Sequence, residues 1–218
     1  MRRRLLTIAL TVLTAFPALY GQFSPTLGVK GGISLANQSF RFTPIDYTLE
    51  TEPLVGPALS LFVEAFRGVH FSFQIDISYA LKGSSSSIQS VTVNHLDNDR
   101  ITVNEGELTT STFKYLSLAP MARYRMGQAS LVPYFLLGPR IDMLLNYSTD
   151  SEYPLYGQNG TILGLTCGAG LEFRFQQLGL FAELQYLPDL SPVINREPLL
   201  INNNMISLTL GLRWFVSE

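Results

Sequence analysis

The sequence from position 69 to position 80 reads VHFSFQIDISYA and alternates between two kinds of residue. Large apolar residues occupy every second position from Val69 to Tyr79, and polar or small residues lie between them. Side chains of a strand point alternately to its two faces, so this segment is a strand with one apolar and one polar face. Its length is close to the roughly 9–11 residues that a tilted strand needs to cross a bilayer.

The composition is typical of a chain that meets lipid. Hydrophobic residues make up 46% and charged residues 15% of its 218 positions, whereas soluble domains carry about 25% charged residues. No internal stretch offers the ~20 continuous apolar residues of a membrane helix. A membrane β-barrel explains both observations, because only every second residue of its strands faces lipid.

The N-terminus is interpreted as a secretory signal peptide over residues 1–21, with the barrel domain at residues 22–218. Three arginines at positions 2–4 precede a short apolar run, which is the order of a signal peptide. A single membrane anchor is the alternative. Removal of the arginines leaves 12 basic residues against 17 acidic ones, a net charge of −5 that argues against a nucleic-acid partner.

The alternation recurs in about eight segments, which predicts an all-β fold, a single eight-stranded antiparallel up-and-down transmembrane β-barrel. The predicted strands are at residues 26–36, 55–66, 69–80, 113–125, 132–146, 162–175, 178–186 and 205–216.

The connections between these strands alternate between long and short. The long ones cover residues 41–53, 81–112, 147–161 and 187–204, and the short ones lie at 67–68, near 127 and at 176–177. Outer-membrane barrels have long loops outside the cell and short turns in the periplasm, so we expect both termini on the periplasmic side. The longest connection, 81–112, either forms a polar loop or extends the barrel as a hairpin.

Proline and glycine mark two special places in the predicted strands. Proline cannot donate a hydrogen bond to a neighbouring strand, so we expect a β-bulge at Gly138–Pro139. Gly164, Gly168 and Gly170 share one polar face, where they leave room for a large neighbouring side chain such as an arginine. A ligand niche is the alternative interpretation of these glycines.

The balance of charge on the polar faces indicates that they line the lumen. A soluble lipocalin-like barrel has the opposite arrangement, with an apolar interior. Acidic and basic residues nearly cancel, as a narrow lumen requires because an unpaired buried charge is costly. We therefore predict a lumen filled by polar and charged side chains. The predicted lumen charge network comprises Lys30, Glu64, Asp76, Arg123, Arg125, Arg140, Asp142, Glu172, Arg174, Glu183 and Arg213.

Aromatic residues on the apolar faces gather near the strand ends. Amphipathic rings favour the headgroup level of a membrane, so we predict two interfacial girdles. The alternative is that aromatic residues simply favour strands. The predicted interface aromatics are Tyr79, Tyr124, Tyr147, Phe175, Tyr186 and Trp214.

Three segments resemble a known family. They are GVKGGISLA at 28–36, VPYFLLGPR at 132–140 and ISLTLGLRWF at 206–215, which are similar to strands of PorT-like outer-membrane β-barrel proteins of the Bacteroidetes. The resemblance covers nearly the whole mature chain. It implies an outer-membrane barrel, and, because the family includes a component of a protein secretion system, an accessory role in secretion. The last segment also resembles the signal read by the outer-membrane assembly machinery, which implies that machinery as a partner.

The sequence offers little that indicates catalysis. His95 lies near Asp97 and Asp99 in the longest connection, but this spacing is generic and a solvated loop is the favoured interpretation. No zinc spacing or nucleotide-binding loop is present in the sequence. We predict that the protein is not an enzyme and has no cofactor and no metal site.

The favoured function is a structural, adhesive or interaction role through long acidic extracellular loops. Outer-membrane lipid and lipopolysaccharide are the expected surroundings, and protein partners are expected at the loops. An accessory role in secretion is the alternative, and an outer-membrane enzyme or a small pore is less favoured.

Overall fold

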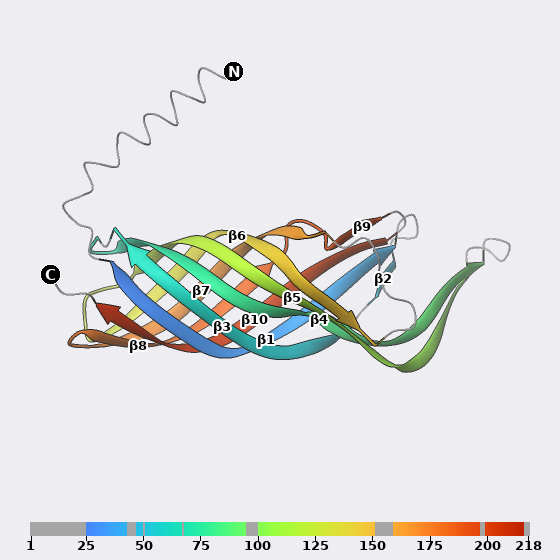
Figure 1. The fold of residues 1–218 in the computed structure, drawn as a ribbon, viewed down its shortest axis with the longest axis horizontal. Helices are drawn as coiled ribbons and strands as arrows, with labels where there is room; N and C mark the ends of the chain where they lie inside the picture. Colours follow the sequence, from blue (N-terminus) through green and yellow to red (C-terminus); the bar gives the residue numbers. More distant parts are fainter. Residues whose placement is uncertain are drawn as a thin grey trace, which may run out of the picture.

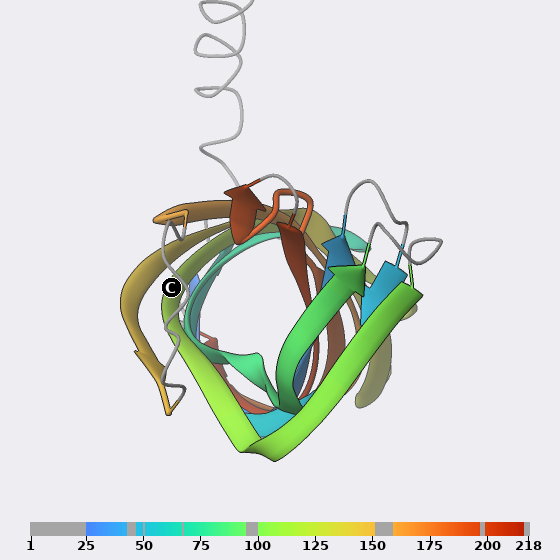
Figure 2. The same ribbon diagram turned by 90° about the vertical axis from the view of Figure 1, so that its right-hand side faces the viewer.

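In the described part of the chain, ten antiparallel strands form one sheet that closes into a barrel (Figures 1 and 2). They are β1 Thr26–Phe42, β2 Tyr47–Leu49, β3 Glu52–Ala65, β4 Phe71–Asn94, β5 Arg100–Arg125, β6 Leu131–Thr149, β7 Thr161–Phe175, β8 Leu178–Pro188, β9 Ile194–Arg196 and β10 Leu199–Phe215. The short strands β2 and β9 pair with one end of β1 and of β10, respectively, and the other eight strands form the wall. Pairing of β1 with β10 closes the barrel.

The computed structural model describes residues 25–42, 47–49, 51–66, 68–94, 100–150, 159–196 and 199–215. The predicted signal peptide lies outside the described residues, as do His95, Asp97 and Asp99. Among the described residues, no helix is long and apolar enough to cross a membrane.

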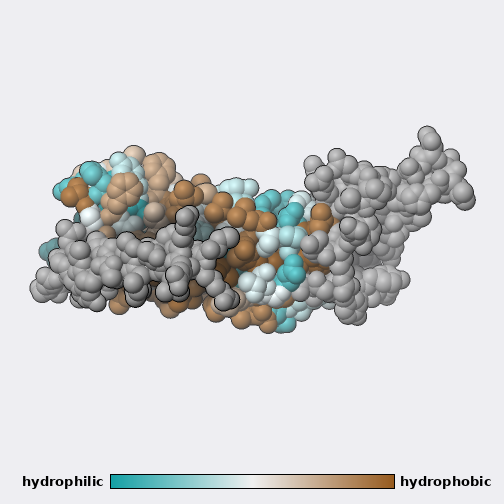
Figure 3. All heavy atoms as spheres, turned by 90° about the horizontal axis from the view of Figure 1, so that it is seen from above, coloured by the Kyte–Doolittle hydropathy of each residue, from teal (hydrophilic) through white to brown (hydrophobic). Residues whose placement is uncertain are grey.

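Side chains alternate between the outside and the lumen along the wall strands. In β4, Ile75 and Ile77 are exposed, whereas Asp76 between them is buried. β8 alternates in the same way from Leu178 to Leu187. Hydrophobic residues consequently cover much of the visible outer wall (Figure 3). The predicted fold, an eight-stranded barrel with a polar, filled lumen, is confirmed.

The short connections and both ends of the described chain share one end of the barrel. Each short connection contains a residue with positive φ: Phe66 at 51°, Gly127 at 105° and Gln176 at 50°. Such left-handed residues let a strand reverse direction within a few positions. Thr26 pairs with Phe215 at the same end. We call this the turn end and the opposite end the loop end.

The longest predicted connection is mostly a hairpin that extends β4 and β5 beyond the barrel (Figure 1). β3 pairs with β4 as far as Ser85, and β6 pairs with β5 as far as Ser111. Beyond these residues, β4 and β5 continue to pair with each other as far as Asn94 and Arg100. The hairpin therefore projects from the loop end as a two-stranded ribbon.

The predicted β-bulge at Gly138–Pro139 is wrong. The register of β5 against β6 is the same on both sides of this point, and it places Pro120 opposite Pro139. Neither proline has an N–H group, so the two share one local interruption of the ladder and no shift is needed. The register shift between these strands lies at Lys114–Tyr115, nearer the loop end.

Closure of the barrel brings β1 and β10 very close at Gly32. A Cβ atom at this position would lie 2.0 Å from the carbonyl oxygen of Leu208 and 2.8 Å from Cα of Thr209. Both of these are backbone atoms, so a larger residue could be accommodated only by moving one of the two strands.

We expect Gly32→Ala to lower the free energy of unfolding by about 1–3 kcal/mol, the usual cost of overpacking. Urea unfolding in detergent micelles, followed by the fluorescence of the single tryptophan, measures the change. Gly160→Ala is the control, because nothing lies within 4 Å of a Cβ atom there. An equal loss of stability in both variants would contradict the close-approach argument.

Candidate functional site in the barrel lumen

In the described residues, the ion pairs of the lumen form three groups along the barrel. The turn-end group is centred on Glu64, whose carboxylate is shared by three arginines. Arg125 Nη1 lies 2.9 Å from Oε1 and Arg123 Nη1 lies 3.3 Å from Oε2, and Arg213 Nη1 also contacts Oε2. All four side chains are buried. One carboxylate therefore holds guanidinium groups from β5 and β10 against β3.

Glu172 of β7 completes the turn-end group. Its carboxylate contacts Arg123 and lies 3.0 Å from Arg213 Nη1, so these two arginines are shared between two glutamates. Arg174 Nε donates to Glu172 Oε1 at 2.7 Å. The Arg174 side chain is 23% exposed and is the most accessible member of the group.

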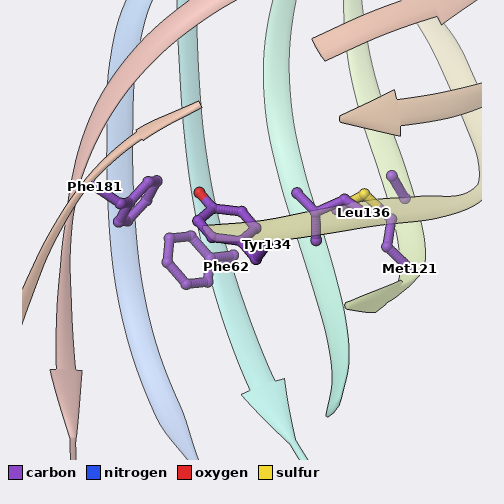
Figure 4. Packing of buried hydrophobic residues seen from close by; sticks show 6 residues of the cluster. Phe62, Met121, Tyr134, Leu136 and Phe181 are labelled. Carbon is purple, nitrogen blue, oxygen red and sulfur yellow. The ribbon is translucent and has the colours of Figure 1, made fainter. Parts of the chain in front are cut away.

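An aromatic layer of Phe62, Tyr134 and Phe181 (Figure 4) adjoins the turn-end group, whose Arg213 lies over the Phe62 ring. Phe62 and Phe181 meet edge to face with ring centroids 5.6 Å apart. Arg123 stacks on Tyr134, with its guanidinium carbon 3.7 Å from the ring centroid. This contact joins the charged group to the aromatic layer, because a guanidinium binds favourably over an aromatic face.

Glycines on neighbouring strands make room for the aromatic side chains of this layer and for Arg140. A Cβ atom at each would collide with one of them: Gly28 with Phe62 (2.1 Å), Gly211 with Phe181 (2.2 Å), Gly170 with Tyr134 (2.4 Å) and Gly164 with Arg140 (2.5 Å). The prediction that the β7 glycines accommodate a large neighbour is thus confirmed at Gly164 and Gly170.

The middle group pairs one lysine with two carboxylates. Lys30 Nζ lies 2.6 Å from Asp76 Oδ2 and 2.5 Å from Glu183 Oε1. Neutral donors complete the arrangement: Tyr134 OH donates to Glu183 Oε2 at 2.9 Å, and Gln74 Nε2 donates to Asp76 Oδ1 at 2.7 Å. The excess negative charge is therefore stabilised by hydrogen bonds as well as by the lysine.

The loop-end group balances two cations against two carboxylates. Lys82 Nζ lies 2.6 Å from both Asp142 Oδ2 and Asp189 Oδ1. Arg140 bridges the same two residues, with Nε 2.9 Å from Asp142 Oδ1 and Nη2 2.5 Å from Asp189 Oδ1. Asp189 follows β8 directly, so this group ties the connection after β8 to the barrel wall.

Every residue of the predicted lumen network lies in one of these groups, and their role as a functional site stays a prediction. Sequence reasoning missed Lys82 and Asp189, because both were assigned to long connections. The alternation of faces along a strand could have identified them. Lys82 continues the lumen row of Asp76 and Ala80, and Asp189 continues that of Glu183.

Most of the predicted interface aromatics lie on the outward face. Tyr124, Phe175 and Trp214 are exposed near the turn end, and Tyr186 is exposed nearer the loop end. Tyr79 is half-buried in the outward row of β4. The outward position agrees with a girdle, and contact with a membrane interface stays a prediction.

The prediction for Tyr147 is wrong. The register shift at Lys114–Tyr115 pairs Tyr147 directly with Phe113, a buried lumen residue, with ring centroids 4.7 Å apart. Tyr147 therefore packs against an apolar cluster at the loop end. The shift reverses the alternation of faces, as one residue of slip always does.

We expect Glu64→Gln to lower the free energy of unfolding by about 3–5 kcal/mol, because it leaves buried guanidinium groups short of negative charge. Urea unfolding in micelles measures the loss. Glu52→Gln, at an exposed glutamate of β3, is the control and should change stability by no more than about 0.5 kcal/mol. If Glu64→Gln behaves like this control, the shared carboxylate does not hold the strands together.

Comparison with known proteins agrees with the geometry. Residues 22–195 match a family described as "Outer membrane protein beta-barrel domain". No curated protein matches the chain.

Several solved structures are similar in fold. Neisserial surface protein A is 14% identical, with 87% of this chain and 97% of that chain covered and a TM-score of 0.49. OprG from Pseudomonas aeruginosa is 9% identical, with 89% and 98% covered and a TM-score of 0.49. Ail of Yersinia pestis is 14% identical, with 88% and 99% covered and a TM-score of 0.39.

Proposed function

Because the chain belongs to the outer membrane protein beta-barrel domain family, we propose that it is an integral outer-membrane protein with a structural, adhesive or interaction role at its loop end. The observation that carries the proposal is the contrast between a filled lumen and a projecting hairpin of β4 and β5. The protein contacts its partners at the loop end, and the filled lumen stabilises the barrel.

The lumen supports a role other than transport. An eight-stranded barrel has an interior just wide enough for side chains. Here charged and aromatic side chains from strands that are not neighbours in the sheet contact one another inside it. Passage of a solute would require these buried ion pairs to separate, and separating a buried pair is costly.

The hairpin supports an interaction role. Strand edges with unpaired N–H and C=O groups are templates for pairing with another chain. An isolated two-stranded ribbon is only marginally stable in water. Among the described residues, the part of the hairpin beyond Ser85 and Thr110 pairs with no third strand and has this form. A partner that supplies a further strand or packs on the ribbon would stabilise it.

The proposed orientation places the loop end outside the cell and the turn end, with both termini, in the periplasm. Residues 1–21 act as the export signal, and the last strand is read by the assembly machinery. The outward apolar rows face lipid. The aromatics near both ends lie at the headgroup level, with lipopolysaccharide around the loop end.

An accessory role in protein secretion, as in PorT-like proteins, is the second candidate. It is favoured by the similarity of segments 28–36, 132–140 and 206–215 to that family. In that case the loop end or the periplasmic turns would contact other subunits of a secretion complex.

Replacement of residues 86–109 by a two-residue Asn-Gly turn tests the interaction role. The variant should still fractionate with the outer membrane and migrate differently on unheated and heated detergent gels, because the barrel wall is unchanged. Proteins cross-linked to the full-length chain on intact cells should be lost. Shortening of the turn at residues 127–130 is the control at the opposite end. Retention of the same partners without the hairpin would contradict the proposal, and partners lost with the turn variant would favour the secretion role.

Planar-bilayer recording tests the filled lumen. We expect no steady ion conductance from the purified barrel, because charged side chains pair across its interior. A mock preparation without the protein sets the background. A large, steady, protein-dependent conductance would show that the ion pairs leave an open path.

A further inference from the structure

The outer face of the barrel wall carries a hollow of about 370 Å³ over β6, β7, β8 and β10. We call it the wall hollow. Ten residues line it, the lining is almost entirely apolar, and the hollow is open to the outside. Its volume is at the lower end of the roughly 300–1,000 Å³ of small-molecule binding sites. The wall hollow can therefore hold part of a flexible ligand but not a bulky one.

Two alanines on adjacent strands account for the wall hollow. Ala169 of β7 pairs with Phe135 of β6 on one side and with Leu184 of β8 on the other. Ala182 of β8 pairs with Leu171 of β7. Phe135, Leu171 and Leu184 are outward residues with 50–54% exposure. Each alanine therefore lies beside larger outward side chains, and the space above it stays unfilled.

The wall hollow lies in the part of the wall nearer the turn end. On β7, Leu171 and Ala169 are four and six positions from Phe175 at the turn end, and ten and eight positions from Thr161. With a rise of about 3.3 Å per residue and a strand tilt of about 40°, this places the hollow roughly 10–15 Å from the turn end along the barrel axis. The apolar band of such barrels is about 25 Å tall, so the hollow opens at hydrocarbon depth.

The position and lining of the wall hollow select its ligand. The outward face of an outer-membrane barrel contacts lipid, and the hollow is continuous with that face. A protein partner fits it poorly, because a stable interface takes about 800 Å² and 20–30 residues from each side, whereas ten residues line the hollow. An inserted peptide segment would also leave backbone N–H and C=O groups unpaired against an apolar lining.

An acyl chain gains more contacts in the wall hollow than elsewhere on the wall. Lipid tails are as apolar as leucine, so association within a membrane depends on van der Waals packing. An unfilled space deprives its lining of attractive contacts. A chain that lies on Ala169 and Ala182 also touches the flanking Phe135, Leu171 and Leu184, whereas a chain on the convex wall is contacted from one side.

We propose that the wall hollow is a binding site for one acyl chain of a phospholipid whose headgroup lies at the turn end. The two alanines receive the chain, and the larger side chains beside them hold it laterally. The bound chain exchanges with bulk lipid more slowly than chains elsewhere on the wall. The site rests on the proposed insertion of the outward rows into the membrane, and its test separates the two.

Photocrosslinking of the full chain in phosphatidylcholine vesicles tests the site. The probe is a phosphatidylcholine with a diazirine near the end of one acyl chain, and the adducts are mapped by peptide mass spectrometry. Residues that line the hollow should carry about threefold more adducts than Leu59 and Leu61 of β3, because a chain with more contacts stays longer. These leucines are matched controls, since they lie six and four positions from the turn end of β3 and are 56% and 61% exposed.

The pattern of adducts distinguishes the site from membrane insertion itself. Equal labelling of both walls would overturn the site and leave insertion intact. An absence of adducts from both walls would contradict insertion, and the site with it.

Filling the wall hollow provides a second test. Ala182→Phe should lower the adducts on Ala169 and Leu184 about threefold, because the added ring takes the place of the chain. Ala122→Phe is the control, at an outward alanine of β5 that does not line the hollow, and should leave these adducts unchanged. Unchanged labelling in Ala182→Phe would overturn the proposal. Should this variant fail to fold, the comparison with β3 in the unaltered chain still decides.

Two other occupants are outcomes of the same experiment. A second copy of the chain would protect the hollow from the probe, and a bifunctional thiol reagent would then link the two copies through Cys167, which is two positions from Ala169 on the same strand. Protection together with linked dimers would overturn the lipid site. Lipopolysaccharide added to the vesicles should leave the adducts unchanged, and their loss would assign the hollow to lipopolysaccharide instead of phospholipid.

Discussion

In the hydrocarbon core of a membrane, every backbone N–H and C=O group must find its partner within the protein. The pairing of β1 with β10 meets this demand, because it gives every wall strand two neighbours. Closure with eight wall strands also sets the width of the interior, and that width leaves room for side chains alone. The alternating pattern and the paired charges are both consequences of this closure.

The charged lumen is built from residues far apart in the sequence. Lys30 meets Glu183, and Glu64 meets Arg213, only when the first and last thirds of the chain come together. Buried charges without partners are unfavourable, so an open sheet would leave these groups in water. The ion pairs thus favour the closed barrel over partly closed forms, although their net contribution to stability after desolvation is modest.

The alternation of apolar and polar residues made most of the barrel predictable, because the apolar face of such a strand must face lipid and its polar face must face the lumen. The errors have separate local causes. Lys82 and Asp189 were assigned to loops because polar residues surround them, although their parity follows the lumen row. Tyr147 was misplaced because nothing in the sequence marks the register shift at Lys114–Tyr115. At Pro139 the sequence predicted a register shift that does not occur, because a second proline on the neighbouring strand makes a bulge unnecessary.

Asp189 gives the connection after β8 an unusual constraint. Surface loops of barrels generally tolerate insertions and deletions, but this connection begins with a carboxylate that must reach Lys82 and Arg140. An insertion before Asp189 would withdraw the carboxylate from both cations, whereas added residues after Ile194 would not. Among natural relatives, the length of this connection is therefore expected to vary after Ile194 and not before Asp189.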